Sequence, residues 1–429
     1  MNQLREQDCA VHSWYRFVLS FPPHLVQDYI NRFKLDSNHR LLDPFCGTGT
    51  TVVEAKKQGI ASVGVEANPM AWFAGSVKLD WRPDPTHLFD SAQQISQAAK
   101  TLIEKQDQPL RTLSDDSQKI ILRNSISPLP LHKTLILLEQ IKLNAKATDA
   151  PHLQLALAKA VVTSISNLRF GPEVGVGKAK SDAPVVEAWL QEVTQIAQDL
   201  SQLQPLKDGP GIIHHADARQ VLGVLEPNSI DAVITSPPYP NEKDYTRTTR
   251  LESVLLGFIR NKQELRLLKE GLIRSNTRNV FKADHDDVWV SKHLEIQKIA
   301  NSIEERRLAL GKTSGFERLY HRAVKLYFGG MAKHLADLRL VLRPGAQLAY
   351  VVGDQKSYLQ ILIPTGALLG DIAQALGYEL VGIELFRTRL STATKEQMRE
   401  EVVLLRWSGN FPSTPYPFRD DYGRVCGSP

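Results

Sequence analysis

Short apolar runs that end in turn residues are spread along the chain, and long helical stretches separate them. Arg40–Phe45 and Ala61–Glu66 have the pattern of buried strands, with a helix predicted between them over Thr51–Gln58. This strand–turn–helix–strand order is typical of the start of a doubly wound α/β sheet. Further strands are predicted at Gly211–His215, Ile230–Ile234 and Gln347–Val352.

Two long interruptions divide the predicted sheet. From about residue 75 to residue 204 the apolar spacing is helical, and from 241 to about 327 the chain is charged and mostly helical. Tyr378–Phe386 and Glu401–Trp407 are predicted to close the sheet as an antiparallel pair, and the tail from Ser408 is expected to be irregular. The expected fold is therefore a Rossmann-like α/β sheet, mostly parallel with an antiparallel closing strand, that carries two mainly helical inserts.

These patterns predict a catalytic domain in three segments, 1–75, 206–240 and 331–429. Two inserts separate them: a helical insert over 76–205 and a basic, mainly helical insert over 241–330, which is the candidate for DNA recognition.

The composition is that of a globular protein in a reducing compartment. The chain has 429 residues, of which 42% are hydrophobic and 23% charged. Its three cysteines are too few and too scattered for a disulfide framework or a zinc site. The N-terminus lacks the apolar core of a signal peptide, and no stretch reaches the roughly 18 apolar residues of a membrane span. We expect a cytoplasmic protein without a membrane partner.

The charge distribution is compatible with a polyanionic partner. The net charge is +5, and residues 242–325 contain 18 basic and 12 acidic side chains. The first insert is close to neutral. A basic excess alone is permissive for nucleic acid and does not diagnose it.

Two motifs each follow a predicted strand. The first is the run from Asp43 to Thr51, in which Gly47-Thr48-Gly49 lets the backbone approach a ligand closely. It lacks the third glycine of a dinucleotide-binding turn. Glu66 stands at the end of the second strand, about 20 positions on, where an acidic residue can bind ribose hydroxyls. The second motif is Thr235-Ser236-Pro237-Pro238-Tyr239, whose consecutive prolines make a stiff loop.

Together the two motifs resemble the paired signatures of the amino-methyltransferases of DNA. Residues 12–33 and 240–256 resemble the segments that flank these motifs in the family. The resemblance implies a cofactor, S-adenosylmethionine, and an exocyclic base nitrogen as the methyl acceptor. It implies cofactor contacts at Asp43, Phe45, Cys46, Gly47, Thr48, Gly49, Thr50, Glu66 and Asp217. Asp43 would bind the cofactor's amino group, and Asp217 the amino group of its adenine.

The resemblance also assigns the catalytic residues. Ser236 and the carbonyl of Pro237 would hold the two amine hydrogens, Pro238 would stiffen the loop, and Tyr239 would stack on the base after it leaves the duplex. Members with serine at the first position mostly methylate cytosine N4, so Ser236 favours that product. Three alternatives stay open: an N6-adenine enzyme, an RNA base methyltransferase, and a catalytically inactive DNA-binding subunit.

The expected partners are double-stranded DNA and a cognate restriction endonuclease. Phosphate contacts are predicted at Arg247, Arg250, Arg274 and Arg278. No metal is expected, because the adjacent His214 and His215 of one strand point to opposite faces. A Gly-rich basic loop around residues 167–178 lies inside the first insert and is close either to DNA or to the active site, or simply ends a helix. The residues leave open which insert recognises the target sequence.

Overall fold

The computed structural model describes residues 4–17, 20–105, 109–171, 174–204, 209–241, 243–390 and 396–412, and the structural statements below concern these residues. No helix among them is long and apolar enough to cross a membrane. The part of the predicted irregular tail beyond residue 412 lies outside the described residues.

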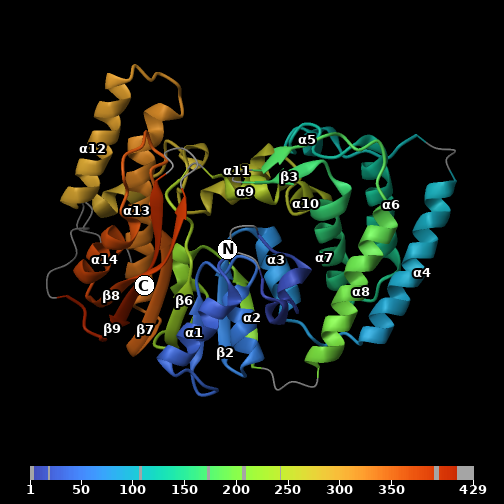
Figure 1. The fold of residues 1–429 in the computed structure, drawn as a ribbon, viewed down its shortest axis with the longest axis horizontal. Coiled ribbons are helices and arrows are strands. Elements are labelled where there is room, and N and C mark those ends of the chain that lie inside the picture. The colour runs from blue at the N-terminus through green and yellow to red at the C-terminus, as the bar shows by residue number, and fades with distance from the viewer. Residues whose placement is uncertain are drawn as a thin grey trace.

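A seven-stranded sheet forms the centre of the molecule (Figure 1). Its strands lie in the order β5 (Gly211–His215), β2 (Ala61–Glu66), β1 (Arg40–Asp43), β6 (Ile230–Thr235), β7 (Leu342–Gly353), β9 (Gln397–Trp407) and β8 (Tyr378–Leu390). The first five strands pair in parallel, whereas β9 is antiparallel to both β7 and β8. The predicted mostly parallel sheet with an antiparallel closing strand is confirmed.

The strand order reverses at β1. From β1 the sheet grows to β2 and β5 on one side, and to β6 and β7 on the other. In open α/β sheets, ligands bind outside the carboxyl ends of the strands at such a reversal. The turn after β1 and the loop after β6 therefore both begin at the edge where a ligand site is expected.

Helices cover both faces of the sheet. Leu41 of β1 packs with α1 (Pro23–Phe33) on one face. Its neighbour Leu42 belongs to the core with α13 (Tyr320–Leu338) and α14 (Thr365–Ala375) on the other. Because successive strand residues alternate between two buried faces, the central strands are continuous apolar runs in the sequence.

The first insert is a helical bundle on one side of the sheet, at the right of Figure 1. It contains α4 (Pro85–Glu104), α5 (Asp115–Gln118), α6 (Pro128–Asn144), α7 (Ala150–Ala160), the short η3 (Val161–Ile165) and α8 (Val185–Leu203). Its apolar residues share a core with α2 (Thr50–Lys57) and α3 (Pro69–Lys78). The helical prediction is confirmed for most of this segment.

A small antiparallel hairpin, β3 (Leu168–Phe170) and β4 (Val174–Val176), interrupts the first insert. Asn167 anchors it, because its Nδ2 donates to the Ser127 hydroxyl at 3.0 Å and its Oδ1 accepts from the Lys180 N–H at 2.9 Å. The prediction of a Gly-rich loop here placed the segment correctly but did not include the strands.

The second insert divides between the two sides of the molecule (Figure 1). α9 (Tyr245–Thr248), α10 (Arg250–Leu255) and α11 (Lys262–Glu270) lie beside the β3–β4 hairpin, whereas α12 (Leu294–Ala309) lies with α13. Short turns connect them: η5 (Thr277–Asn279), η6 (Asp286–Val290) and η7 (Glu317–Leu319). The predicted boundary at 330 falls inside α13, whose apolar face belongs to the core of the sheet.

The remaining short elements lie near the N-terminus and after β5. They are η1 (Glu6–Asp8), η2 (His12–Trp14) and η4 (Ala218–Gly223).

Candidate active site

A cavity of about 620 Å³ opens at the carboxyl ends of β1, β2 and β6. Its volume lies in the usual range for small-molecule sites, roughly 300–1,000 Å³. Its wall combines segments that are far apart in the sequence: Phe17, Ser20 and Phe21, the turn after β1, residues 65–68, Phe170, Gly171 and Val174, residues 217–218, residues 236–239, 241, 243–245, 247 and 248, residues 271–273, 275, 278 and 279, and the facing ends of β8 and β9. The cavity is therefore built by the sheet and by both inserts.

The turn after β1 brings backbone to the cavity wall. Gly47 and Gly49 have φ values of 52° and 87°, which glycine adopts without strain. A Cβ on Gly49 would also lie 3.3 Å from the Cα of Gly75. Lys78 supports the turn from the interior, since its side chain is 1% exposed and its Nζ donates to the Thr48 carbonyl at 3.1 Å. The conformation of the turn is thus set by its own sequence and by the helix beneath it.

Glu66 fixes the turn from the neighbouring strand and also lines the cavity. Its Oε2 accepts from the Gly47 N–H at 2.8 Å, and its Oε1 accepts from the Asn68 N–H at 2.7 Å. Asn68 caps α3, and Pro69 takes the first helical position. Burial raises the pKa of Glu66 to about 7. A ligand that donates hydrogen bonds to this carboxylate would therefore favour its ionised form.

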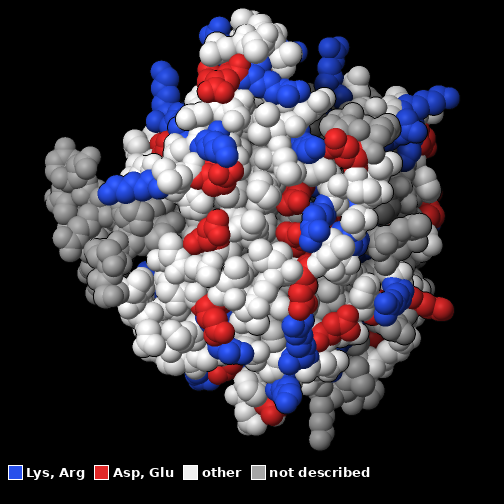
Figure 2. All heavy atoms as spheres, turned by 60° about the vertical axis from the view of Figure 1, so that its left-hand side comes forward, with Lys and Arg blue, Asp and Glu red and all other residues white. Residues whose placement is uncertain are grey.

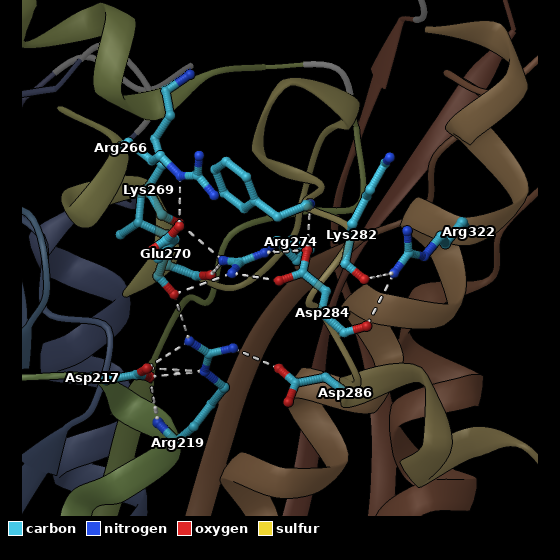
Figure 3. Close-up of polar contacts among 12 residues, drawn as sticks. Asp217, Arg219, Arg266, Lys269, Glu270, Arg274, Lys282, Asp284, Asp286 and Arg322 are labelled. Atoms are coloured by element: carbon cyan, nitrogen blue, oxygen red, sulfur yellow. Dashed lines mark hydrogen bonds and ion pairs between the residues drawn. The ribbon is translucent and has the colours of Figure 1, made fainter. Parts of the chain in front are cut away.

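Asp217 lines the cavity at the end of β5 and is held by a neighbouring arginine (Figure 3). Its Oδ1 accepts from the Arg219 backbone N–H at 2.9 Å, and its carboxylate receives the Nε and Nη2 of Arg219 at 3.0 and 2.6 Å. This bidentate pairing fixes the orientation of the carboxylate at the wall.

Asp43 lies beneath the cavity and is not among the described residues that line it. Its side chain is 0% exposed, and its Oδ1 accepts from the Thr235 hydroxyl at 2.5 Å and from the Phe45 N–H at 3.1 Å. Burial raises the pKa of Asp43 to about 6. The expected direct contact with the cofactor's amino group does not match this placement, because the carboxylate joins β1 to β6 below the wall. Gly49, also predicted to contact the cofactor, is likewise not among the described residues that line the cavity, although its positive φ sets the conformation of the turn.

The other residues predicted for the cofactor turn, Phe45, Cys46, Thr48 and Thr50, line the cavity. Burial raises the pKa of the Cys46 thiol well above its usual range. The thiol therefore stays protonated and is unsuited to act as a nucleophile.

The loop after β6 forms the opposite wall. Ser236, Pro237, Pro238 and Tyr239 all line the same cavity as Glu66. The Ser236 hydroxyl donates to the Val351 carbonyl of β7 at 3.0 Å and also lies against the Tyr239 hydroxyl, so its oxygen keeps a lone pair that can accept. A Cβ on Gly353 would lie 3.0 Å from the Tyr239 ring, so glycine at this position allows β7 to pack closely against that ring.

The four arginines predicted to contact phosphates fall into two pairs. Arg274 is 4% exposed, and its guanidinium binds Asp284 at 2.9 and 2.8 Å and three backbone carbonyls. Arg250 is also buried, and it donates to the Thr246 hydroxyl at 2.7 Å and to a carbonyl of the first insert. The expectation of phosphate contacts fails for this pair, because both guanidinium groups are occupied inside the protein.

The other pair lies at the cavity. Arg247 lines it, and its Nε has no hydrogen-bond partner among the described residues. Arg278 is exposed at the cavity wall, with its guanidinium carbon 5.9 Å from the ring centre of Phe316. These two side chains are placed where a polyanion entering the cavity would meet them.

Basic side chains are not gathered in one patch on the face drawn in Figure 2. Lys and Arg side chains are interspersed there with Asp and Glu. Several basic residues of the second insert are already ion-paired: Arg260 with Glu264, Arg266 with Glu270, Lys269 with Asp244, Arg274 with Asp284, and Arg307 with Glu304. The net charge of this insert therefore points to a polyanion-binding surface less directly than Arg247 and Arg278 at the cavity do.

Comparisons with known proteins find similar sequences among DNA methylases. A family model of the N6 and N4 methyltransferases, described as DNA methylase, matches residues 5–71, which include the turn and Glu66. Type II methyltransferase M.BsoBI of Geobacillus stearothermophilus is 26% identical, over 93% of this chain and 84% of that protein. Type II methyltransferase M.AvaI of Nostoc sp. is 24% identical, over 90% and 82%.

These matches support the amino-methyltransferase family of DNA methylases for this chain. A solved structure, TrmN from Thermus thermophilus, matches over 90% of this chain and 48% of its own chain at 12% identity and a TM-score of 0.30. That score is too low to add to the fold, which the strand order itself defines.

The sequence did not identify two contributors to this site, His334 and Glu400. His334 of α13 is 0% exposed, its ring nitrogens bind the Ala218 carbonyl and the Tyr350 hydroxyl at 2.7 Å each, and its ring contacts Phe45. Burial lowers the pKa of His334 to about 4, so it is neutral. The β8–β9 pair contributes Glu400. The β3–β4 hairpin contributes Phe170, in the segment that the sequence offered as close either to DNA or to the active site. A single histidine in an amphipathic helix and the ends of two long strands carry no distinctive sequence signal.

Proposed function

We propose that this protein transfers a methyl group from S-adenosylmethionine to the exocyclic amine of a base in double-stranded DNA, with cytosine N4 as the acceptor. The observation that carries the proposal is the cavity that holds Glu66 on one wall and Ser236 to Tyr239 on the other. Direct transfer requires the methyl donor and the acceptor amine to be held in one site.

The chemistry of one wall fits the cofactor. S-adenosylmethionine, when bound, supplies an electrophilic methyl group on a sulfonium sulfur. Each Glu66 oxygen accepts one backbone N–H and keeps a second lone pair, which suits a ribose hydroxyl. Asp217 is oriented at the wall and would accept from the adenine amine. Asp43 would act indirectly, by holding the start of the turn against β6.

The other wall fits an amine. An exocyclic amine is a weak nucleophile because its lone pair is delocalised into the ring, and two acceptors on its hydrogens draw it toward tetrahedral geometry. The Ser236 hydroxyl hydrogen is committed to Val351, so toward the cavity this side chain can only accept. The Pro237 carbonyl would be the second acceptor, since the following Pro238 offers no competing N–H.

Tyr239 would hold the base itself. Its ring lies in the cavity wall against β7, and burial raises the pKa of its hydroxyl, so the side chain stays neutral. An aromatic ring at this position would stack on a base that has left the duplex.

We further propose that residues 241–330 carry most DNA contacts, with Arg247 and Arg278 meeting phosphates near the extruded nucleotide. The neutral first insert would contribute the β3–β4 hairpin at the cavity. Two relatives carry the name Type II methyltransferase, and a cognate restriction endonuclease is therefore the expected partner. Adenine N6 is the second candidate acceptor, because a serine hydroxyl accepts equally well from either amine.

The test is a transfer assay with the purified protein, methyl-labelled S-adenosylmethionine, and plasmid DNA or total RNA in parallel reactions. We expect label in DNA and not in RNA, and much slower labelling of DNA with Tyr239→Ala at the same protein concentration. Label in RNA alone would show that the substrate is RNA and not DNA. Label in neither, with wild-type protein that binds S-adenosylhomocysteine, would support the inactive subunit instead.

A further inference from the structure

One guanidinium connects the cofactor wall of the cavity to the second insert (Figure 3). Arg219 follows β5 and is 8% exposed. Its Nε and Nη2 bind Asp217, its Nη1 binds the Asp286 carboxylate at 2.5 Å, and its Nη2 also donates to the Glu270 carbonyl at 3.2 Å. Asp217 lines the cavity, whereas Glu270 and Asp286 flank the loop 271–279, which lines the cavity from the insert.

The ends of this loop are otherwise tied within the protein. Arg274 binds Asp284 and the carbonyls of residues 269, 270 and 272, and Arg322 donates to the Asp284 carbonyl at 3.0 Å. The Asp286 backbone packs so closely on α13 that a Cβ on Gly329 would collide with it. Arg219 differs from the other two arginines in this network because it also binds a carboxylate of the cofactor wall.

We propose that Arg219 is a positioning residue that couples occupancy of the cofactor site to the conformation of the base-side loop 271–279. A ligand that donates a hydrogen bond to Asp217 would change the position of the carboxylate that orients Arg219. Because a planar guanidinium binds both acids in a fixed fork, the orientation preferred at Asp217 is passed to Asp286 and Glu270. The loop carries Ser275, Arg278 and Asn279 to the cavity, so a bound cofactor would order the wall that receives the base.

This inference rests on the proposed function, since it needs Asp217 to face the cofactor. It goes beyond that function by assigning to Arg219 and Asp286 a role that neither performs by touching the cofactor or the DNA base. The coupling is a difference between two ligand states, so it is measured by comparing the loop with and without ligand.

The experiment is hydrogen–deuterium exchange of the full chain with and without S-adenosylhomocysteine, with affinity measured by calorimetry on the same samples. The variants are Arg219→Lys, which replaces the fork by a point charge, and Asp286→Asn, which leaves the Asp217–Arg219 pair intact. Arg274→Lys is the matched control, because it loosens the same loop from a buried arginine that does not touch Asp217. Circular dichroism verifies that each variant is folded.

In the wild type we expect the ligand to slow exchange in peptides covering 43–50 and 271–280, by about fivefold or more in the loop. In Asp286→Asn the slowing at 43–50 and the affinity should persist, within about twofold, while the slowing at 271–280 is lost. Arg219→Lys should lose the loop response and also bind more weakly. In Arg274→Lys the loop should exchange faster without ligand and still respond to it.

Equal protection of 271–280 in Asp286→Asn and the wild type would overturn the role of Arg219 alone. Normal binding without any loop response in the wild type would do the same. A wild-type protein that does not bind S-adenosylhomocysteine would overturn the cofactor assignment, and this inference with it.

Discussion

Replacing Ser236 by alanine tests the assignment of the base-side acceptor. The substitution removes the hydroxyl that donates to the Val351 carbonyl at 3.0 Å and that would accept from the amine. As a neutral hydrogen bond the structural part contributes about 1 kcal/mol to the free energy of unfolding. The contact with the amine gains charge as the methyl group arrives, so its loss should cost about 1.5–3 kcal/mol in the transition state. That corresponds to a fall in kcat of roughly 10- to 150-fold.

Ser229 is the matched control for this change. It precedes β6 as Ser236 follows it, and its hydroxyl also donates to a backbone carbonyl, that of Glu226 at 2.6 Å. Ser229→Ala should therefore lose similar stability and keep full activity, because this side chain is not among the described residues that line the cavity.

The assay is single-turnover transfer of labelled methyl to plasmid DNA, with affinity for S-adenosylhomocysteine measured by calorimetry. Ser236→Ala should turn over slowly while its cofactor affinity is unchanged, since the two walls are separate. Full activity in Ser236→Ala would show that other groups hold the amine. A parallel loss in Ser229→Ala would show that the effect is one of stability.

Three further predictions concern the remaining parts of the site. Affinity for S-adenosylhomocysteine should fall as the pH drops through about 7, because the Glu66 carboxylate then becomes protonated. Glu66→Gln should weaken binding and remove this pH dependence, and an unchanged pH dependence in the variant would assign the titration to another group. Tyr239→Ala should lower kcat/KM by the equivalent of about 1–3 kcal/mol, because it removes stacking on the base, whereas Tyr239→Phe keeps the ring and should retain most activity. Equal losses in both variants would implicate the hydroxyl instead of stacking. The salt dependence of duplex DNA binding should weaken in Arg247→Gln and in Arg278→Gln, each lowering the slope of log K against log salt by about 1. Arg307→Gln is the control, because Arg307 is paired to Glu304 on α12. Unchanged slopes in the first two variants would place the phosphate contacts on another surface.

The strands were predictable because their burial imposes a local pattern. A parallel sheet covered on both faces needs continuous apolar runs, and β1, β2 and β6 appear in the sequence as such runs that end in turn residues. The prediction that β1 extends to Phe45 was two residues too long, because the chain leaves the sheet at Asp43 to form the turn. The motif residues of the loop after β6 lie together in the cavity because the topology sets them beside the turn.

The arginines show where sequence reasoning ends. Arg247, Arg250, Arg274 and Arg278 have similar polar neighbours in the chain, and only the fold separates the two that are buried from the two at the cavity. A buried guanidinium needs acceptors that come from distant segments, such as the carbonyl of Ile120 for Arg250. Those acceptors leave no local pattern, so the network around Arg219 was equally hidden.

The most direct test of the account is the identity of the product. Plasmid DNA from a host that lacks DNA methylation is incubated with the purified protein and S-adenosylmethionine, digested to nucleosides and analysed by mass spectrometry. The account predicts N4-methylcytosine, absent from reactions without cofactor. N6-methyladenine as the sole product would refute the argument from Ser236 and leave the amino-methyltransferase site intact. Finding 5-methylcytosine, or no methylated nucleoside at all, would contradict the proposed chemistry.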